Sequence, residues 1–303
     1  MDNVGVLQRE KVLKKKINLK RELGKMSIDI DPVKIFKHIS LIGMSLAMIF
    51  PFIWMISSSL KTNYEIWNEP FKIIPDVPQW FSFVDAFKSA PFGMYLFNSG
   101  FTAIIITFIL TINSAMFAYA ITQFKFKGRG ILFAIIMGIY MLPTAVTYVP
   151  SYIILARMNL LDSYTGLIFS NAASIFGIFL FRQTFLKVNE SLIEAARIDG
   201  ASEWTILWKI VFPITKPSFV TFGLITFITN YNSYLWPSLI IKSPERSLIS
   251  IGLRQFFIQD GAYGINWSQI MAGSTIAVMP LLIIFVFTQK FFINGIADSG
   301  VKE

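Results

Sequence analysis

Six long stretches without any charged residue constrain the fold of this chain more than any other feature. No Asp, Glu, Lys or Arg occurs in 38–60, 89–124, 130–156, 163–181, 217–241 or 261–289. Each stretch is long enough for a membrane-crossing helix, which needs about 20 apolar residues. Runs such as FTAIIITFIL do not alternate as the strands of a membrane barrel do. We therefore expect an all-α membrane protein, a bundle of six transmembrane helices.

The composition excludes several kinds of active site. Of the 303 residues 54% are hydrophobic and only 15% are charged, against about a quarter charged in soluble domains. The absence of cysteine excludes disulfides, thiolate metal sites and cysteine nucleophiles. The single histidine, His38, begins the first span, where we expect an interfacial residue. No phosphate-binding loop and no catalytic Ser/His or paired-carboxylate arrangement occurs, so we expect a transport protein without enzyme activity, metal or cofactor of its own.

The distribution of Lys and Arg predicts the orientation in the membrane. If both termini are cytoplasmic, the inside segments carry 10, 3, 5 and 2 Lys or Arg residues, which is 20 of the 27. This asymmetry follows the positive-inside rule. The basic run KVLKKKINLKR at residues 11–21 contributes much of the net charge of +9. Topology and attraction to anionic lipid explain this charge, so we expect a lipid bilayer rather than nucleic acid as the partner of the run. The N-terminal run is predicted to be either an amphipathic surface helix or a disordered tail.

These patterns divide the chain into three parts. Residues 1–37 form a basic cytoplasmic segment, 38–293 form the transmembrane domain, and 294–303 form a cytoplasmic tail. The spans are expected at about 38–60, 94–122, 130–156, 163–183, 214–241 and 265–290, and a charged insert is expected at 189–213. Pro143 and Pro150 fall inside the third span, and Gly166 and Gly177 suit close helix contact in the fourth.

The charged insert reads as two short helices joined by a turn. Asn189 or Ser191 can cap the first helix, and Gly200 is placed to end it in a left-handed conformation. The second helix is expected to start at a Ser202 cap and to end before Pro213. A solvated loop would explain the charges alone. A helix that docks into a cleft also explains the small residues Ala195 and Ala196, and we favour it.

Several stretches resemble one known family. EAARIDGASEWTILWKIVFPITKPS, from Glu194 onward, is similar to the EAA signature of the permease subunits of binding-protein-dependent ABC importers, in the form typical of the carbohydrate (maltose-permease-like) branch. FAYAITQFKFKGRG at 117–130, YLFNSGFTA at 95–103, NYNSYLWPSLI at 230–240 and GIADSGVKE at 295–303 resemble other parts of that branch. The sequence departs from the family at Asn189, Ser191, Tyr231 and Glu303.

The resemblance implies a type I ABC importer fold and a set of partners. The insert would be the coupling helix that seats in a cytoplasmic ATPase dimer, and that dimer would bind the ATP and Mg. A second homologous permease would complete the pore, and an extracellular solute-binding protein would deliver a sugar or oligosaccharide. The location would be the bacterial cell (plasma or inner) membrane, crossed several times. The residues implied in ATPase coupling are Glu194, Ala195, Ala196, Arg197, Asp199, Gly200 and Pro213.

Polar and aromatic residues at membrane depth are the candidates for the substrate path. They are Asn113, Asn230, Tyr231, Asn232 and Tyr234. Uncharged amides beside aromatic rings suit the hydroxyls and apolar faces of a sugar. Hydrogen bonding between helices is the alternative role. It is favoured for Asn113 and weighs equally with a substrate role for Asn230 and Asn232.

Two other functions stay open from the sequence. The same machinery could import another polar solute, such as a glycerol phosphodiester or an acidic oligosaccharide. A self-sufficient ion-coupled carrier or channel is the third possibility. The cores of the six expected spans contain no acidic residue. This counts against the carrier, because a coupling ion usually needs an ionisable group within the membrane.

Overall fold

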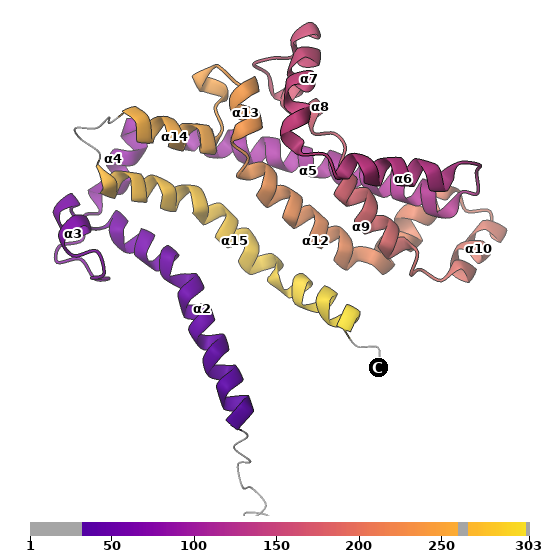
Figure 1. The fold of residues 1–303 in the computed structure, drawn as a ribbon, viewed down its shortest axis with the longest axis horizontal. Helices are drawn as coiled ribbons and strands as arrows, with labels where there is room; N and C mark the ends of the chain where they lie inside the picture. Colours follow the sequence, from indigo (N-terminus) through magenta and orange to yellow (C-terminus); the bar gives the residue numbers. More distant parts are fainter. Residues whose placement is uncertain (1–31, 260–265, 301–303) are drawn as a thin grey trace, which may run out of the picture. The chain divides into compact units, whose positions relative to one another are not determined.

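The computed structural model describes residues 32–259 and 266–300, all as helices and their connections without a strand. Most of the predicted N-terminal segment and the last three residues lie outside this described part. The elements are α2 (Pro32–Ser59), α3 (Asn63–Asn68), α4 (Phe81–Ser89), α5 (Phe92–Gln123), α6 (Arg129–Tyr140), α7 (Thr144–Arg157), α8 (Tyr164–Ser170), α9 (Ile175–Phe185), α10 (Glu190–Ile198), α11 (Glu203–Ile206), η1 (Leu207–Val211), α12 (Phe212–Tyr231), α13 (Leu235–Ile240), η2 (Pro244–Arg246), α14 (Ile249–Gln259) and α15 (Trp267–Gly300) (Figure 1).

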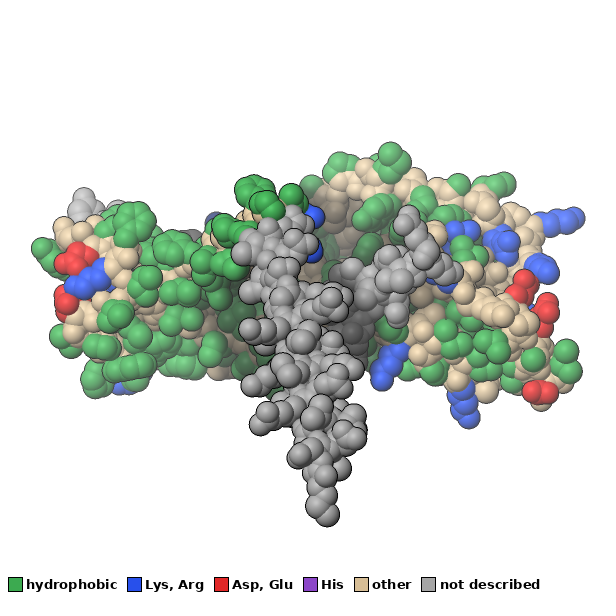
Figure 2. Space-filling model, turned by 90° about the horizontal axis from the view of Figure 1, so that it is seen from below, with side chains coloured by type: hydrophobic (Ala, Val, Ile, Leu, Met, Phe, Trp, Pro, Cys, Tyr) green, Lys and Arg blue, Asp and Glu red, His purple; other side chains and the backbone are tan. Residues whose placement is uncertain are grey.

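The chain forms two compact units. The first ends at Ile53, and its described part is the beginning of α2, an apolar helix whose side chains are exposed along residues 32–53. The second runs from Trp54 to the C-terminus. In this unit hydrophobic side chains cover much of the left part of the face in Figure 2, and charged side chains lie towards its left and right ends. This banded distribution is that of a protein crossing a bilayer.

The six predicted spans correspond to four long apolar helices and two bent pairs. α2, α5, α15 and the continuous helix of residues 203–231 are each long and apolar enough to cross a membrane. The pair α6 and α7 is bent by 99° and the pair α8 and α9 by 48°. The all-α multispan architecture predicted from the sequence is confirmed.

Proline chemistry explains the first break. Leu142 precedes Pro143, and a residue before proline is disfavoured in helical conformation. α6 therefore ends at Tyr140 and α7 begins after Pro143. One span was expected over 130–156, and the structure differs from this expectation by the sharp bend. Pro150 lies inside α7 without ending it.

Close helix contact in the fourth span is confirmed at Gly177, whereas Gly166 contacts the connection that precedes its own helix. A Cβ atom at Gly177 would lie 2.5 Å from Ser114 Oγ of α5 and 2.6 Å from Cζ of Phe222 of α12. α9 therefore packs tightly between these two helices. At Gly166 a Cβ atom would meet the carbonyl oxygen of Leu160 at 2.0 Å.

The segment between α2 and α5 is folded and contains α3 and α4. Thr62 caps α3 in a capping box with Glu65, and the Glu65 carboxylate also accepts from the Asp76 backbone N–H at 2.8 Å. These backbone donors lower the pKa of Glu65. Trp54 donates from Nε1 to the Pro70 carbonyl at 2.7 Å. The segment is thereby fastened to the end of α2.

Candidate functional site: the cytoplasmic insert and the polar groups of the spans

The insert folds as the predicted helix, turn and helix. Asn189 caps α10 by accepting from the Ser191 N–H at 3.0 Å, and Ser202 caps α11 by accepting from the Thr205 N–H at 3.2 Å. At the end of α10 Gly200 has a φ of +79°. The Ala201 N–H reaches the Ala196 carbonyl at 2.9 Å and the Gly200 N–H reaches the Arg197 carbonyl at 3.0 Å. This is a Schellman motif, and it requires the left-handed residue that glycine supplies.

The two alanines of the EAA signature face opposite sides. Ala196 and Ile193 are buried against the bundle, and Ile193 is completely inaccessible. Ala195 lies on the exposed side of α10 together with Leu192 and with Ile198, whose side chain is 86% exposed. We call Leu192, Glu194, Ala195, Ile198 and Asp199, all exposed, the outer face of α10. Leu192 and Ile198 were not in the predicted coupling set, although their spacing of three from Ala195 places all three on one helical face.

Arg197 points to the bundle rather than outward. Its guanidinium makes two hydrogen bonds to the Glu203 carboxylate, from Nε at 2.7 Å and from Nη2 at 3.2 Å. The Tyr119 hydroxyl of α5 donates to the same carboxylate. Arg197, Glu203 and Tyr119 thus form a brace that joins α10, α11 and α5. Glu203 and Tyr119 were not among the predicted coupling residues, because only the fold brings residues 119 and 203 together.

The second helix of the insert does not end before Pro213, and that prediction was wrong. The helix runs unbroken from Glu203 to Tyr231 through the π-turn η1. The Phe212 N–H bonds the Leu207 carbonyl, five residues back. Pro213 has no N–H to donate and its ring needs space in the preceding turn. The wider π-turn supplies that space, so the helix continues through Pro213. Pro213 is exposed at the start of α12, where it forms part of a span.

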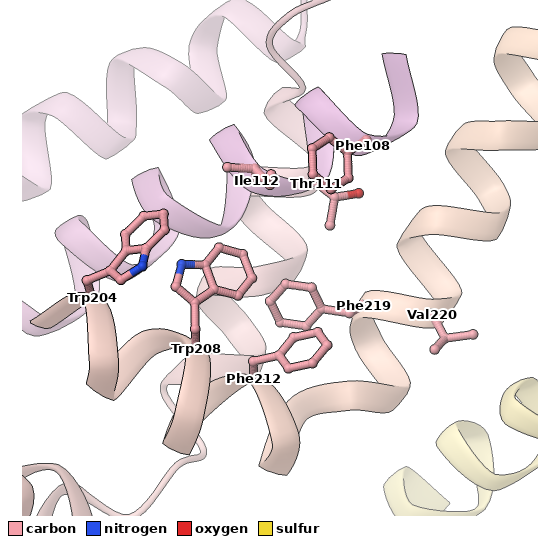
Figure 3. A pocket seen from close by; sticks show the side chains of 8 residues that line it. All are labelled: Phe108, Thr111, Ile112, Trp204, Trp208, Phe212, Phe219 and Val220. Carbon is pink, nitrogen blue, oxygen red and sulfur yellow. The ribbon is translucent and has the colours of Figure 1, made fainter. Parts of the chain in front are cut away.

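An apolar cavity lies beside this helix. It has a volume of about 520 Å³ and is lined by Phe108, Thr111, Ile112, Trp204, Trp208, Phe212, Phe219 and Val220. Figure 3 shows the Trp and Phe side chains of the helix of residues 203–231 facing Phe108, Thr111 and Ile112 of α5. The one hydroxyl among the lining side chains, of Thr111, donates to the Thr107 carbonyl at 2.7 Å. A sugar would find almost no polar partner here.

Two of the substrate-path candidates form hydrogen bonds to other segments of the bundle. Asn113 donates to the Ala172 carbonyl at 2.8 Å, in the break between α8 and α9. This contact is of the kind expected from the favoured alternative, hydrogen bonding within the bundle, and a substrate role for Asn113 stays a prediction. Tyr231 is buried, and its hydroxyl donates to the Ala277 carbonyl of α15 at 3.0 Å. This burial places Tyr231 in the packing between α12 and α15.

The other candidates lie where α12 ends. Asn230 is half-buried and donates to the Thr226 carbonyl of its own helix at 2.8 Å, whereas Asn232 is exposed. Tyr234 is half-buried and lines an open pocket with residues of α14. The predicted fifth span over 214–241 is interrupted here, since Pro237 offers no N–H to the Ser233 carbonyl. That carbonyl accepts from the Ser250 hydroxyl at 2.6 Å.

An acidic residue fastens the loops at this end of the molecule. Asp162 accepts from the backbone N–H groups of Lys242 and Ser243, each at 2.9 Å, from the Ser243 hydroxyl and from Arg246. The Ser243 hydroxyl and these N–H donors lower the pKa of Asp162 to about 2. The carboxylate is therefore ionised at any physiological pH, and its loop contacts are retained.

Comparison with known proteins identifies the family. Residues 114–298, more than half of the chain, match the family described as binding-protein-dependent transport system inner membrane component. The chain belongs to this family. The family is a membrane component of transport systems and not an enzyme family, and this agrees with the multispan fold.

This permease aligns with nearly the whole length of two curated relatives. The sn-glycerol-3-phosphate transport system permease protein UgpE of Pectobacterium atrosepticum is 35% identical over 272 residues, 88% of this chain and 96% of that protein. The arabinooligosaccharides transport system permease protein AraQ of Bacillus subtilis is 32% identical over 262 residues, with 86% and 92% covered.

A solved structure supports the type I importer fold of the permease. A chain of a bacterial ABC transporter involved in the import of the acidic polysaccharide alginate matches with a TM-score of 0.78 and 22% identity. The match covers 88% of this chain and 98% of that one. At this identity the likeness concerns the fold alone.

Proposed function

We propose that this chain is the pore-forming permease subunit of an ATP-driven importer that moves a sugar or oligosaccharide into the cell, with α10 as the helix that seats in a cytoplasmic ATPase subunit. The observation that carries this role for α10 is its outer face. Leu192, Ala195 and Ile198 form an exposed apolar strip flanked by Glu194 and Asp199. An apolar helix face with charged flanks fits a groove of a partner protein.

The brace would transmit movement of α10 to the spans. Arg197, Glu203 and Tyr119 connect the insert to α11 and α5, and α11 continues without a break into α12. A shift of α10 driven by closure of an ATPase dimer would therefore move two spans together. The ATP and Mg would be bound by that ATPase, since the chain has no phosphate-binding loop of its own.

The remaining partners follow from the family. A second homologous permease would complete the pore, and an extracellular solute-binding protein would deliver the solute to the end of α12 that carries Asn232 and Tyr234. This arrangement requires α10 and both termini in the cytoplasm, as the Lys and Arg counts predict. Because some relatives are named for sn-glycerol-3-phosphate transport, another polar solute is the second candidate substrate.

Replacing Gly200 tests the coupling role. A valine would be strained at φ +79°, at a cost of about 1–2 kcal/mol, which is about tenfold in an equilibrium constant. We expect Gly200→Val to reduce ATP-driven uptake by about tenfold or more. The measurement is solute uptake by the assembled complex in proteoliposomes with internal ATP.

The matched control is Gly200→Asn, because asparagine tolerates the left-handed region. It should keep most of the uptake, with both variants present in the membrane at wild-type amounts. Uptake that survives Gly200→Val, or that proceeds without any ATPase subunit, would contradict the proposal and favour an ion-coupled carrier.

A further inference from the structure

A pocket lined by an arginine that forms no ion pair with any described residue lies at the end of α12 away from the insert. Its volume is about 350 Å³, and Tyr234, Ser250, Leu253, Arg254 and Phe257 line it. This is within the range of small-molecule sites, at the small end. α13 and α14 lie at this end of α12, whereas α10 lies at the other (Figure 1).

Arg254 differs from the neighbouring arginine in its partners. Arg246 is paired with the Asp162 carboxylate at 3.0 Å. Arg254 is exposed, and among the described residues no carboxylate lies within 4.0 Å of its guanidinium. One N–H of its guanidinium donates to the Tyr234 hydroxyl, and its Cζ lies 5.2 Å from the centre of the Tyr234 ring. Tyrosine thus orients the guanidinium without neutralising it.

An oriented guanidinium is suited to an oxyanion. Its planar set of five N–H donors can bind a carboxylate or phosphate with two parallel hydrogen bonds. With one donor used by Tyr234, the others remain for a ligand. The Ser250 hydroxyl donates to the Ser233 carbonyl at 2.6 Å, so its oxygen can still accept a hydrogen bond from a sugar hydroxyl.

Aromatic rings complete the pocket. Phe257 is 41% exposed and makes an edge contact with Trp267 of α15, with ring centres 6.4 Å apart. Trp267 in turn contacts Trp67 at 5.8 Å. A partly exposed ring held by its neighbours offers an apolar surface to the carbon face of a sugar or polyol.

We propose that this pocket binds the anionic group of the transported solute, and that the substrate class is a sugar or polyol carrying a phosphate or a carboxylate. Arg254 would bind the oxyanion, Tyr234 would orient Arg254, and Phe257 would contact the carbon skeleton. The inference rests on the proposed import function and narrows its substrate class.

The test is a selectivity experiment on the complete transporter with its ATPase, second permease and binding protein in proteoliposomes. The probes are glycerol 3-phosphate, a uronic acid disaccharide and a neutral disaccharide. The wild-type complex should import at least one anionic probe, and the two anionic probes distinguish phosphate from carboxylate. Arg254→Gln should raise the KM of that probe by about tenfold or more, the loss expected for one charge-assisted contact, and change kcat little.

Two control variants separate recognition from other effects. Arg254→Lys keeps the charge without the planar donors and should give an intermediate KM. Arg157→Gln removes an exposed arginine at the end of α7, outside the pocket, and should leave the KM unchanged. Import of the neutral probe alone, or equal KM changes for Arg254→Gln and Arg157→Gln, would overturn the inference while ATP-driven import itself stood.

Discussion

At the scale of single residues, the brace of Arg197, Glu203 and Tyr119 shows how a signature residue can serve the fold of its own chain. Arg197 belongs to the EAA signature, yet it bonds Glu203 rather than facing outward. The predicted coupling set therefore contains two kinds of residue. Glu194, Ala195 and Asp199 belong to the outer face of α10, whereas Ala196 and Arg197 fix the position of α10 on the bundle.

A double-mutant cycle tests the brace. We expect Arg197→Met and Glu203→Gln each to lower the thermal stability of the complex and its ATP-driven uptake, because each removes one side of the bidentate pair. The double variant should be little worse than either single one, with an interaction energy of about 0.5–3 kcal/mol. Lys209→Met, an exposed cation of the same helix, is the matched control. Strictly additive losses would contradict the brace.

At the scale of helices, the approach of α9 to α5 and α12 depends on one missing side chain. A Cβ atom at Gly177 would overlap Ser114 and the buried ring of Phe222, whereas one at Gly223 of α12 would have its nearest neighbour at 4.0 Å. In membranes small residues at such contacts replace the hydrophobic effect as the determinant of helix association. The two glycines thus form a matched pair of packed and open positions.

Alanine at these two glycines should have opposite effects. Gly177→Ala forces an overpacked contact and should destabilise the protein by about 1–3 kcal/mol. Gly223→Ala meets open space and should be neutral or slightly stabilising, because alanine favours helix over glycine. Thermal unfolding of the detergent-solubilised complex measures both effects. Equal melting temperatures of the two variants would show that α9 does not pack against α5 and α12 as described.

At the scale of the whole molecule, the orientation in the membrane is still a prediction from the Lys and Arg counts. The absence of cysteine makes it directly testable, since single cysteines can be introduced without background. Ser202 in the insert and Lys242 beside α13 are both exposed and lie towards opposite ends of the helix that includes α12.

Labelling with a membrane-impermeant maleimide should distinguish the two sides. In intact cells we expect Lys242→Cys to react and Ser202→Cys to remain unlabelled, and both should react after the membrane is permeabilised. The readout is the fraction of the chain that is modified. Labelling of Ser202→Cys in intact cells would reverse the topology and remove α10 from reach of a cytoplasmic ATPase.

Local sequence patterns were enough to predict the multispan architecture, the family and the position of the charged insert. This was possible because each depends on local chemistry: uninterrupted apolar stretches, a glycine in the left-handed region, and caps such as Ser202 that lie within a few residues of the groups they bond. The breaks of the third and fourth spans were less visible. Proline and residues able to cap a helix also occur inside continuous helices, so neither predicts a break by itself. The hydrogen bond from Asn113 to the break at Ala172 forms only in the folded chain.

Only the tertiary structure decided which side of α10 faces outward and which polar residues are occupied by packing. Arg197 meets Glu203 and Tyr119, Tyr231 meets Ala277, and Arg254 stands beside Tyr234 without an acidic partner among the described residues. The physical reason is common to all three. Whether a charged or polar group is neutralised within the chain or left for a ligand depends on residues far away in the sequence, which only the packing of helices brings into hydrogen-bonding distance.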